Sequence, residues 1–332
     1  MGQENVQISF FQHIKALLPP HLSPVDEIAE LLNISNDSAY RRIRGEKPIS
    51  FDELQKLCGH FKISLDQFLH LQSDSLVFTG RSVGQGAFDY EQYLTDVLRN
   101  VQLMNSFPSR ELYYLNKDIP VFHYFLFPEM VAFKSFFWVK TILHSPQYAN
   151  QAFRLDDFKD EKIFALGRQL SEAYHILPSQ EIWNIENINS TIRQIEYYKN
   201  SGVFASKQDI LTIYDCLQKI MDHLERQAEA GCKFTAGGVG ERKGAAYKIY
   251  VNEYILGDNT ILAVLGDRKI TYINHSVLNY LVTSDPGFCE HTYQNIRNLI
   301  KRSMLISEVS EKERRRFFNN IREKITARRN AL

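Results

Sequence analysis

Short apolar-periodic segments separated by turn residues occupy the first seventy positions of the chain. Within each segment the apolar residues recur every three or four positions, which is the spacing of one helix face. Ser23, Ser35 and Ser50 stand just before three segments, where a hydroxyl caps free N–H groups, and Asn33 tolerates the left-handed turn. The pattern predicts five short helices at residues 6–18, 24–33, 36–44, 51–61 and 65–71.

The rest of the chain alternates longer helical patterns with a few runs rich in β-branched and aromatic residues. Ser310 and Glu313 have the spacing of a capping box at the start of a terminal helix. Gly-Asp pairs separate the last strand-like runs, which favours an antiparallel meander. The predicted helices cover 90–104, 160–175, 189–200, 206–230, 288–303 and 310–328. The strand-like runs are 111–115, 121–127, 247–256, 260–265 and 269–274.

These patterns predict a mainly α protein, α+β overall, with a small antiparallel β meander near the C-terminus. A five-helix domain is expected at 1–72, followed by a Ser- and Gly-rich linker at 73–88. Residues 89–332 are expected to form a larger, mostly helical domain for regulation or oligomerisation, with 232–246 as a candidate point of division.

The third predicted helix, residues 36–44, has two chemically different faces. At about 100° per residue, Ala39 and Ile43 share one face, which we expect to point inward. Arg42 lies on the flank, where an acid of a neighbouring helix can pair with it. The outward face carries Asp37, Tyr40, Arg41 and Arg44.

The outward residues have the chemistry of a DNA-reading surface. Arg41 and Arg44 suit bidentate contact to guanine, or contact to phosphate at the groove edge. Asn36 and Ser38 lie in the first turn, where exposed amides favour an anion, and Lys47 follows the helix. The candidate DNA-binding residues are Asn36, Asp37, Ser38, Tyr40, Arg41, Arg44 and Lys47.

The run LSPVDEIAELLNISNDSAYRRIRGEKPISFDELQKLCGHFKISLDQFL resembles the lambda-repressor-like, Cro/C1-type helix-turn-helix, especially its BetR-type members. The likeness rests on Ala29, the LNIS turn, Gly45 and Ser50, and extends over residues 10–72. Arg42 departs from it, because this position commonly holds a bulky apolar residue. The resemblance implies a transcriptional regulator that binds operator DNA as a homodimer.

Charge is unevenly distributed along a chain of zero net charge. Residues 1–75 hold seven Lys/Arg and ten Asp/Glu, hence −3, yet four of the cations fall between Arg41 and Lys47. Residues 301–332 hold ten Lys/Arg and four Asp/Glu, hence +6. This basic segment is read either as a solvated helix face, with Phe317, Phe318, Ile321 and Ile325 as its apolar stripe, or as a supplementary phosphate contact.

No catalytic pattern emerges from the sequence, so we expect no enzyme activity, metal or cofactor. The four cysteines are widely separated, which favours reduced thiols in the cytoplasm. The Gly-rich stretch 237–247 does not fit a phosphate-binding loop. Residues 119–143 are interrupted by prolines and charges and are not expected to span a membrane.

Aromatic residues concentrate at 121–138, which is read as core, or alternatively as a ligand groove or dimer interface. A small-molecule or peptide effector of the C-terminal region is therefore one expectation. The competing hypothesis is a protein-interaction regulator, whose helix-turn-helix docks another protein instead of DNA.

Overall fold

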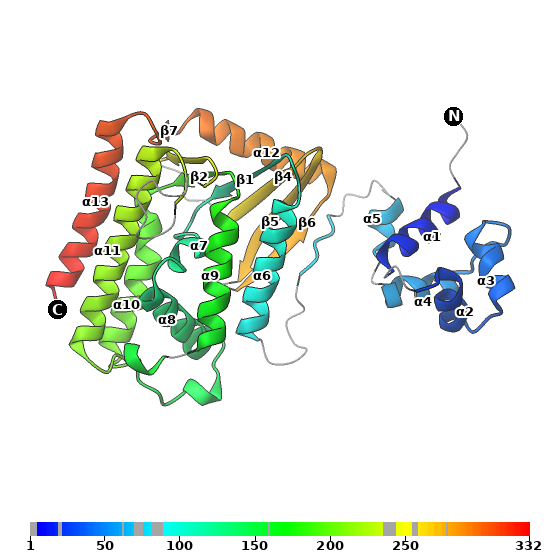
Figure 1. The fold of residues 1–332 in the computed structure, drawn as a ribbon, viewed down its shortest axis with the longest axis horizontal. Coiled ribbons are helices and arrows are strands. Elements are labelled where there is room, and N and C mark those ends of the chain that lie inside the picture. Colours follow the sequence, from blue (N-terminus) through cyan, green and yellow to red (C-terminus); the bar gives the residue numbers. More distant parts are fainter. Residues whose placement is uncertain are drawn as a thin grey trace. The chain divides into compact units, whose positions relative to one another are not determined.

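The structure is a computed structural model that describes residues 5–18, 22–61, 63–69, 76–80, 89–158, 160–234, 244–253, 258–276 and 278–332. It divides into two compact units, Met1–Val77 and Phe78–Leu332 (Figure 1). Of the expected linker at 73–88, only residues 76–80 are among the described residues.

The described part of the first unit contains the five predicted helices around one small core. Ser23 and Ser35 cap α2 and α3 by accepting from the N–H groups of Asp26 and Ser38. Asn33 adopts the left-handed conformation, with φ of 54°, at the turn between these helices. The elements are α1 (Val6–Leu17), α2 (Pro24–Leu32), α3 (Asn36–Ile43), α4 (Phe51–Phe61) and α5 (Leu65–Leu69). Their core contains Phe10, Phe11, Ile14, Ile28, Ala29, Leu32, Ala39 and Leu57.

The second unit is built on a mixed sheet whose described strands have the order β6-β5-β4-β1-β2-β3-β7. The three strands β1, β2 and β3 run parallel, and the remaining neighbours pair antiparallel. The strands are β1 (Arg110–Leu115), β2 (Ser179–Trp183), β3 (Tyr247–Val251), β4 (Thr260–Leu265), β5 (Arg268–Ser276), β6 (Asn279–Thr283) and β7 (Met304–Leu305).

Helices cover both faces of this sheet (Figure 1). Alternate residues of β1 show the division, since Leu112 and Tyr114 join the large helical core whereas Tyr113 packs with Cys289 and Ile296 of α12. The main helices are α6 (Tyr90–Asn105), α7 (Val121–Tyr124), α8 (Pro128–Phe137), α9 (Glu161–His175), α10 (Asn189–Asn200), α11 (Lys207–Ala230), α12 (Pro286–Lys301) and α13 (Glu311–Asn330). A π turn (Trp138–Ile142) and 3-10 turns at Pro146–Tyr148, Leu155–Asp157 and Ile185–Ile188 complete the elements.

The expected helical region with a small antiparallel meander is wrong, because the second unit is a mixed α/β fold. The β4–β5 hairpin is present, and it turns at Gly266. The run at 247–256 does not extend this hairpin, since its strand β3 lies beside β2, with β1 and β2 between it and β4. Parallel pairing joins segments far apart in the sequence, so local periodicity does not reveal it.

Two local expectations are also wrong. Residues 121–127 form α7 and a turn instead of a strand, and Phe122, Tyr124 and Phe125 are buried there in the helical core. Ser310 does not cap α13 with its side chain, because it takes the left-handed conformation with φ of 58°. The first error concerns a segment whose conformation is determined by packing with residues distant in the sequence.

Candidate functional site

The helix α3 presents its predicted outward residues to solvent. Ala39 is buried and Ile43 half-buried, as the helical spacing indicates. Among the candidate residues, Ser38 is half-buried, and the exposed ones are Asn36, Asp37, Tyr40, Arg41, Arg44 and Lys47. The structure therefore brings the candidate set onto and just beyond one exposed helix face.

Arg42 is held inside the unit by an acid of α4, as the flank position predicts. Its guanidinium donates to both carboxylate oxygens of Glu53, from Nη2 over 2.7 Å and from Nε over 3.1 Å, and to Ser38 O. The hydrogen bond from Arg42 is the main reason that the pKa of Glu53 is lowered. Glu53 also accepts from the N–H of Ser50, whose hydroxyl caps α4 in return. Arg42 is therefore a residue that fixes α3 against α4.

Gln7, on α1, fixes the segment that follows α3. Its Nε2 donates to Arg42 O and Lys47 O, each over 2.7 Å, and its Oε1 accepts from Ile49 N. Within this segment Gly45 has φ of 73°, and a Cβ there would lie 2.9 Å from an Asn5 side-chain atom. Sequence reasoning missed Gln7, although it is a polar residue within an apolar-periodic segment.

Some candidate residues already have partners within the unit. Asn36 donates to Asp26 over 2.8 Å, and Arg44 lies 3.3 Å from Glu46 and over the Tyr40 ring. Exposed pairs of this kind contribute little and exchange readily for other partners. Arg41 makes no ion pair with any described residue, so its guanidinium is the most available to an external anion.

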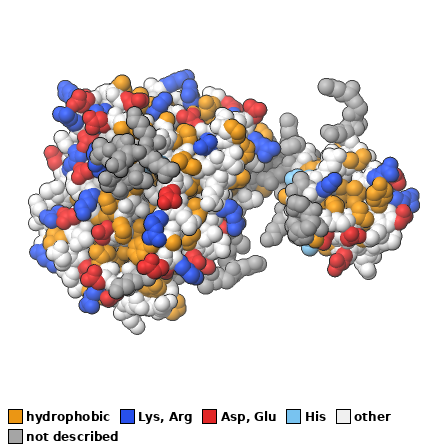
Figure 2. All heavy atoms as spheres, in the orientation of Figure 1, with side chains coloured by type: hydrophobic (Ala, Val, Ile, Leu, Met, Phe, Trp, Pro, Cys, Tyr) orange, Lys and Arg blue, Asp and Glu red, His pale blue; other side chains and the backbone are white. Residues whose placement is uncertain are grey.

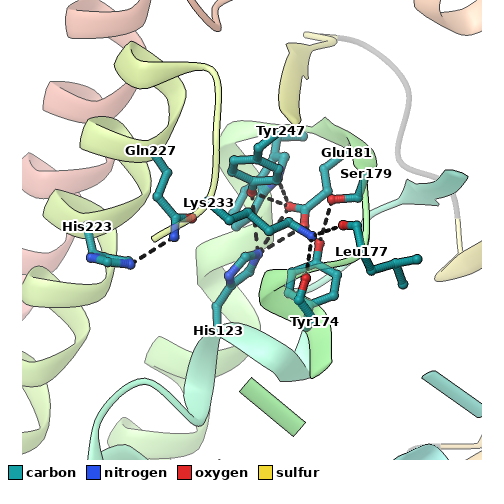
Figure 3. Close-up of polar contacts among 10 residues, drawn as sticks. His123, Tyr174, Leu177, Ser179, Glu181, His223, Gln227, Lys233 and Tyr247 are labelled. Carbon is teal, nitrogen blue, oxygen red and sulfur yellow. Dashed lines mark hydrogen bonds and ion pairs between the residues drawn. The ribbon is translucent and has the colours of Figure 1, made fainter. Parts of the chain in front are cut away.

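A closed polar cluster surrounds Glu181 in the core of the second unit (Figure 3). The carboxylate, on β2, accepts from Trp183 Nε1 over 2.7 Å, from Tyr247 OH over 2.8 Å and from Tyr174 OH, and lies 3.0 Å from His123 Nε2. Burial raises the pKa of Glu181, but His123 and the hydroxyl donors outweigh it and lower the pKa to about 2. This carboxylate has its acceptor sites satisfied by described residues.

The cations and histidines beside this cluster are also enclosed. Lys233 Nζ donates to Tyr174 O and Leu177 O, and burial lowers its pKa well below the ordinary value. His223 Nε2 lies 3.0 Å from Phe234 O, and burial lowers its pKa to about 4. The adjoining cavity has a volume of only 20 Å³, close to that of a single water. The cluster therefore suits a structural role in the core better than a substrate site.

Two larger cavities adjoin one another beside α6. The first, of 260 Å³, has Lys134 and Asp118 in its wall together with aromatic side chains. The second, of 340 Å³, has mainly apolar walls that include Val97, Val101 and Met104. Both are larger than the cavity of about 150 Å³ that holds a benzene molecule, so each has room for a small organic ligand.

Buried asparagines mark the carboxyl ends of the parallel strands. A buried asparagine comes directly after each of the three strands: Asn116 after β1, Asn184 after β2 and Asn252 after β3. Asn184 donates to Asn252 O over 2.7 Å, and Asn187 donates to Asn116 O over 2.6 Å. The side-chain amide of Asn116 has no hydrogen-bond partner among the described residues. Each of the three strands has an aromatic or apolar residue directly followed by Asn (Leu115-Asn116, Trp183-Asn184, Val251-Asn252), which is the sequence signal for this edge.

The basic helix α13 packs alongside α11 and pairs with acids of its own unit (Figure 1). Its apolar stripe is buried, as predicted. On the face of the second unit that Figure 2 shows, positive and negative side chains are interspersed. The pairs are Arg322 with Asp222 and Glu225, Lys324 with Glu186, Arg328 with Glu196, and Arg329 with Asp215. These acids neutralise much of the positive charge of α13, which a supplementary phosphate contact would require.

Comparisons of the chain with protein-family models, with curated proteins and with solved structures found no match. No helix in the described ranges is long and apolar enough to cross a membrane. The side chains that the structure describes include no group of His, Cys, Asp and Glu able to hold a metal ion.

Proposed function

We propose that the protein is a sequence-specific DNA-binding transcriptional regulator that inserts α3 into the major groove. The observation that carries the proposal is the exposed group Tyr40, Arg41 and Arg44 on a helix whose other side is anchored by Ala39 and Arg42. A recognition helix needs this division between a buried face and a base-reading face.

The roles of the individual residues follow from their chemistry. Arg41 and Arg44 contact guanine edges or flanking phosphates, and Lys47 contacts the phosphate backbone. Asn36 and Ser38 lie at the N-terminus of α3, where free N–H groups favour a phosphate. The resemblance to Cro/C1-type regulators supports binding as a homodimer in the cytoplasm, with the second unit as the sensing or assembly module.

In vitro selection of DNA sequences with the full chain tests this proposal. We expect a symmetric site whose half-sites are about one helical turn apart. Arg41→Ala or Arg44→Ala is expected to weaken specific binding by about 1–3 kcal/mol where the residue reads a base. Arg99→Ala is the matched control, because Arg99 is an exposed arginine of the second unit. Failure to enrich any sequence, or unchanged binding in both α3 variants, contradicts the proposal.

The net negative charge of residues 1–75 favours one alternative, a regulator whose first unit docks a protein. That alternative predicts no enriched DNA sequence and a stable protein partner. The same two arginine variants then weaken the protein complex instead of a DNA complex.

A further inference from the structure

The wall of the 260 Å³ cavity in the second unit contains a lysine, Lys134, and an aspartate, Asp118. Neither side chain forms an ion pair with another residue that the structure describes. We propose that this cavity binds a zwitterionic amino acid with an apolar side chain. Its carboxylate pairs with Lys134 and its ammonium pairs with Asp118. The inference concerns the second unit and does not depend on DNA binding.

Lys134 is a buried amine whose hydrogen-bond partners are neutral, although the charge of Asp118 acts on it from elsewhere in the cavity wall. Its side chain, on α8, is 2% exposed, and Nζ donates to Thr191 Oγ1 over 2.8 Å and to Gln194 Oε1 over 2.7 Å. Nζ also lies 4.1 Å from the centre of the Tyr124 ring. Burial lowers the pKa of Lys134 to about 7. Because a buried ammonium is costly without a countercharge, a carboxylate in the cavity gains a strong partner here.

Asp118 supplies the opposite charge. Its backbone N–H lies 3.3 Å from Asn259 Oδ1, whereas its carboxylate has no hydrogen-bond or ion-pair partner among the described residues. The other acid of the wall, Asp258, is paired with Lys117 over 2.8 Å. The cavity therefore offers one cation and one anion to a ligand, and a zwitterion is the charge type that compensates both.

The position and walls of the cavity suit the rest of such a ligand. Lys117 and Asp118 lie just beyond β1, at the carboxyl end of the parallel strands, where α/β folds commonly bind ligands. The described aromatic walls are Tyr93, Tyr114, Tyr124, Trp138 and Tyr280. Such walls bury apolar side chains favourably.

The second cavity gives the apolar side chain more room. The two cavities share Tyr93, Val121, Leu278 and Tyr280 as walls, so they are neighbours. A cavity of about 150 Å³ holds benzene, so 260 Å³ accommodates a branched aliphatic or phenyl side chain with its polar end.

Calorimetric titration of the full chain, without DNA, tests the charge requirement. The probes are L-leucine and L-phenylalanine, each compared with the analogue lacking the amine (4-methylpentanoate, 3-phenylpropanoate) and the analogue lacking the carboxylate (3-methylbutylamine, 2-phenylethylamine). We expect at least one amino acid to bind about 10- to 100-fold more tightly than either of its analogues, the range for a charged hydrogen bond.

Two variants assign the two charges. Lys134→Met is expected to weaken amino-acid binding about 10- to 100-fold. Asp118→Asn is expected to do the same, and also to bring the affinity for the amino acid close to that for its des-amino analogue. Asp118 is only half-buried, so this second variant keeps the test open even where Lys134→Met fails to fold.

Lys140→Met is the matched control, because Lys140 bonds to Tyr148 O and Ala149 O and is not a wall residue of this cavity. It is expected to leave binding unchanged. The proposal is overturned if neither amino acid binds at millimolar concentration, if the des-amino analogues bind as tightly to the wild type, or if folded Lys134→Met and Asp118→Asn proteins bind as the wild type does. None of these results bears on DNA binding by α3, which the selection experiment tests separately.

Discussion

Arg42 and Glu53 form a two-point ion pair between α3 and α4, with Nη2 to Oε1 at 2.7 Å and Nε to Oε2 at 3.1 Å. The pair removes one arginine of the Arg41–Arg44 group from the exposed face. Because Glu53 also belongs to the cap of α4, a single carboxylate joins the start of one helix to the body of another. The orientation of the exposed arginines depends on this connection.

Arg42→Ala is expected to destabilise the first unit by about 1.5–3 kcal/mol, the range for hydrogen bonds to charged groups. The substitution leaves the half-buried Glu53 carboxylate without its main donor. Hydrogen exchange at the amides of α3 and α4 measures the effect within this unit. Arg41→Ala, at an exposed position, serves as the control and is expected to change stability by less than about 0.5 kcal/mol. Equal exchange in the two variants contradicts a structural role for Arg42.

The same pair predicts how the first unit responds to acid. Arg42 lowers the pKa of Glu53 below its ordinary 4.5, so the folded state binds the proton less readily than the unfolded state. The stabilisation is present above the ordinary value and is lost as pH falls through the lowered pKa. Acid unfolding followed by hydrogen exchange of α4 should therefore be less pH-dependent in Arg42→Ala than in the wild type. An unchanged acid dependence contradicts the prediction.

Lys134 predicts a pH dependence of the same sign in the second unit, but in a higher pH range. Burial lowers its pKa from 10.5 to about 7, so folding releases a proton between these two pH values. The cost of the buried charge is greatest below pH 7 and disappears above the unfolded pKa. The melting temperature of the wild type minus that of Lys134→Met should accordingly rise from pH 7 to pH 10. Lys140→Met, which alters a lysine outside the cavity, should show no such trend.

Because the cluster around Glu181 is closed, we expect a substitution in it to lower the stability of the second unit without a specific effect on ligand binding. Glu181→Ala removes the acceptor of Tyr174, Trp183 and Tyr247, and we expect about 3–5 kcal/mol of destabilisation, as for other broken buried ionic clusters. Tryptophan fluorescence monitors this unit, because both tryptophans of the chain, Trp138 and Trp183, belong to it. Stability equal to that of the wild type contradicts the structural role.

Local signals in the sequence predicted most of the helices. The predicted helices at 90–104 and 206–230 are present as α6 and α11, which Asp89 and Ser206 cap. The strand β2 was missed, because its sequence SQEIW is buried on both faces while three of its five residues are polar. Its partners are more than sixty residues away on either side, so only the assembled sheet accounts for these polar side chains.

The exposed face of α3 could be predicted because helical geometry decides which residues share a side. The ion pair of Arg42 followed from the same geometry. The charged residues of the second unit could not be placed in this way. Lys134 interrupts an apolar segment, yet its long side chain is enclosed beside Thr191. Burial of such a group depends on elements that meet only in the folded unit.

The salt dependence of DNA binding distinguishes phosphate contacts from base contacts on the α3 surface. Lys47 lies beyond the end of α3 on an exposed segment, so we expect it to contact phosphate and not to read sequence. Each neutralised phosphate adds about −0.9 to the slope of log affinity against log salt concentration. Lys47→Ala should therefore reduce the slope by about 1 per protomer and weaken all DNA sequences to a similar extent. Arg41→Ala, if it removes a base contact, should instead reduce discrimination between the selected site and its variants. Equal effects of the two substitutions on slope and on discrimination contradict this division of roles.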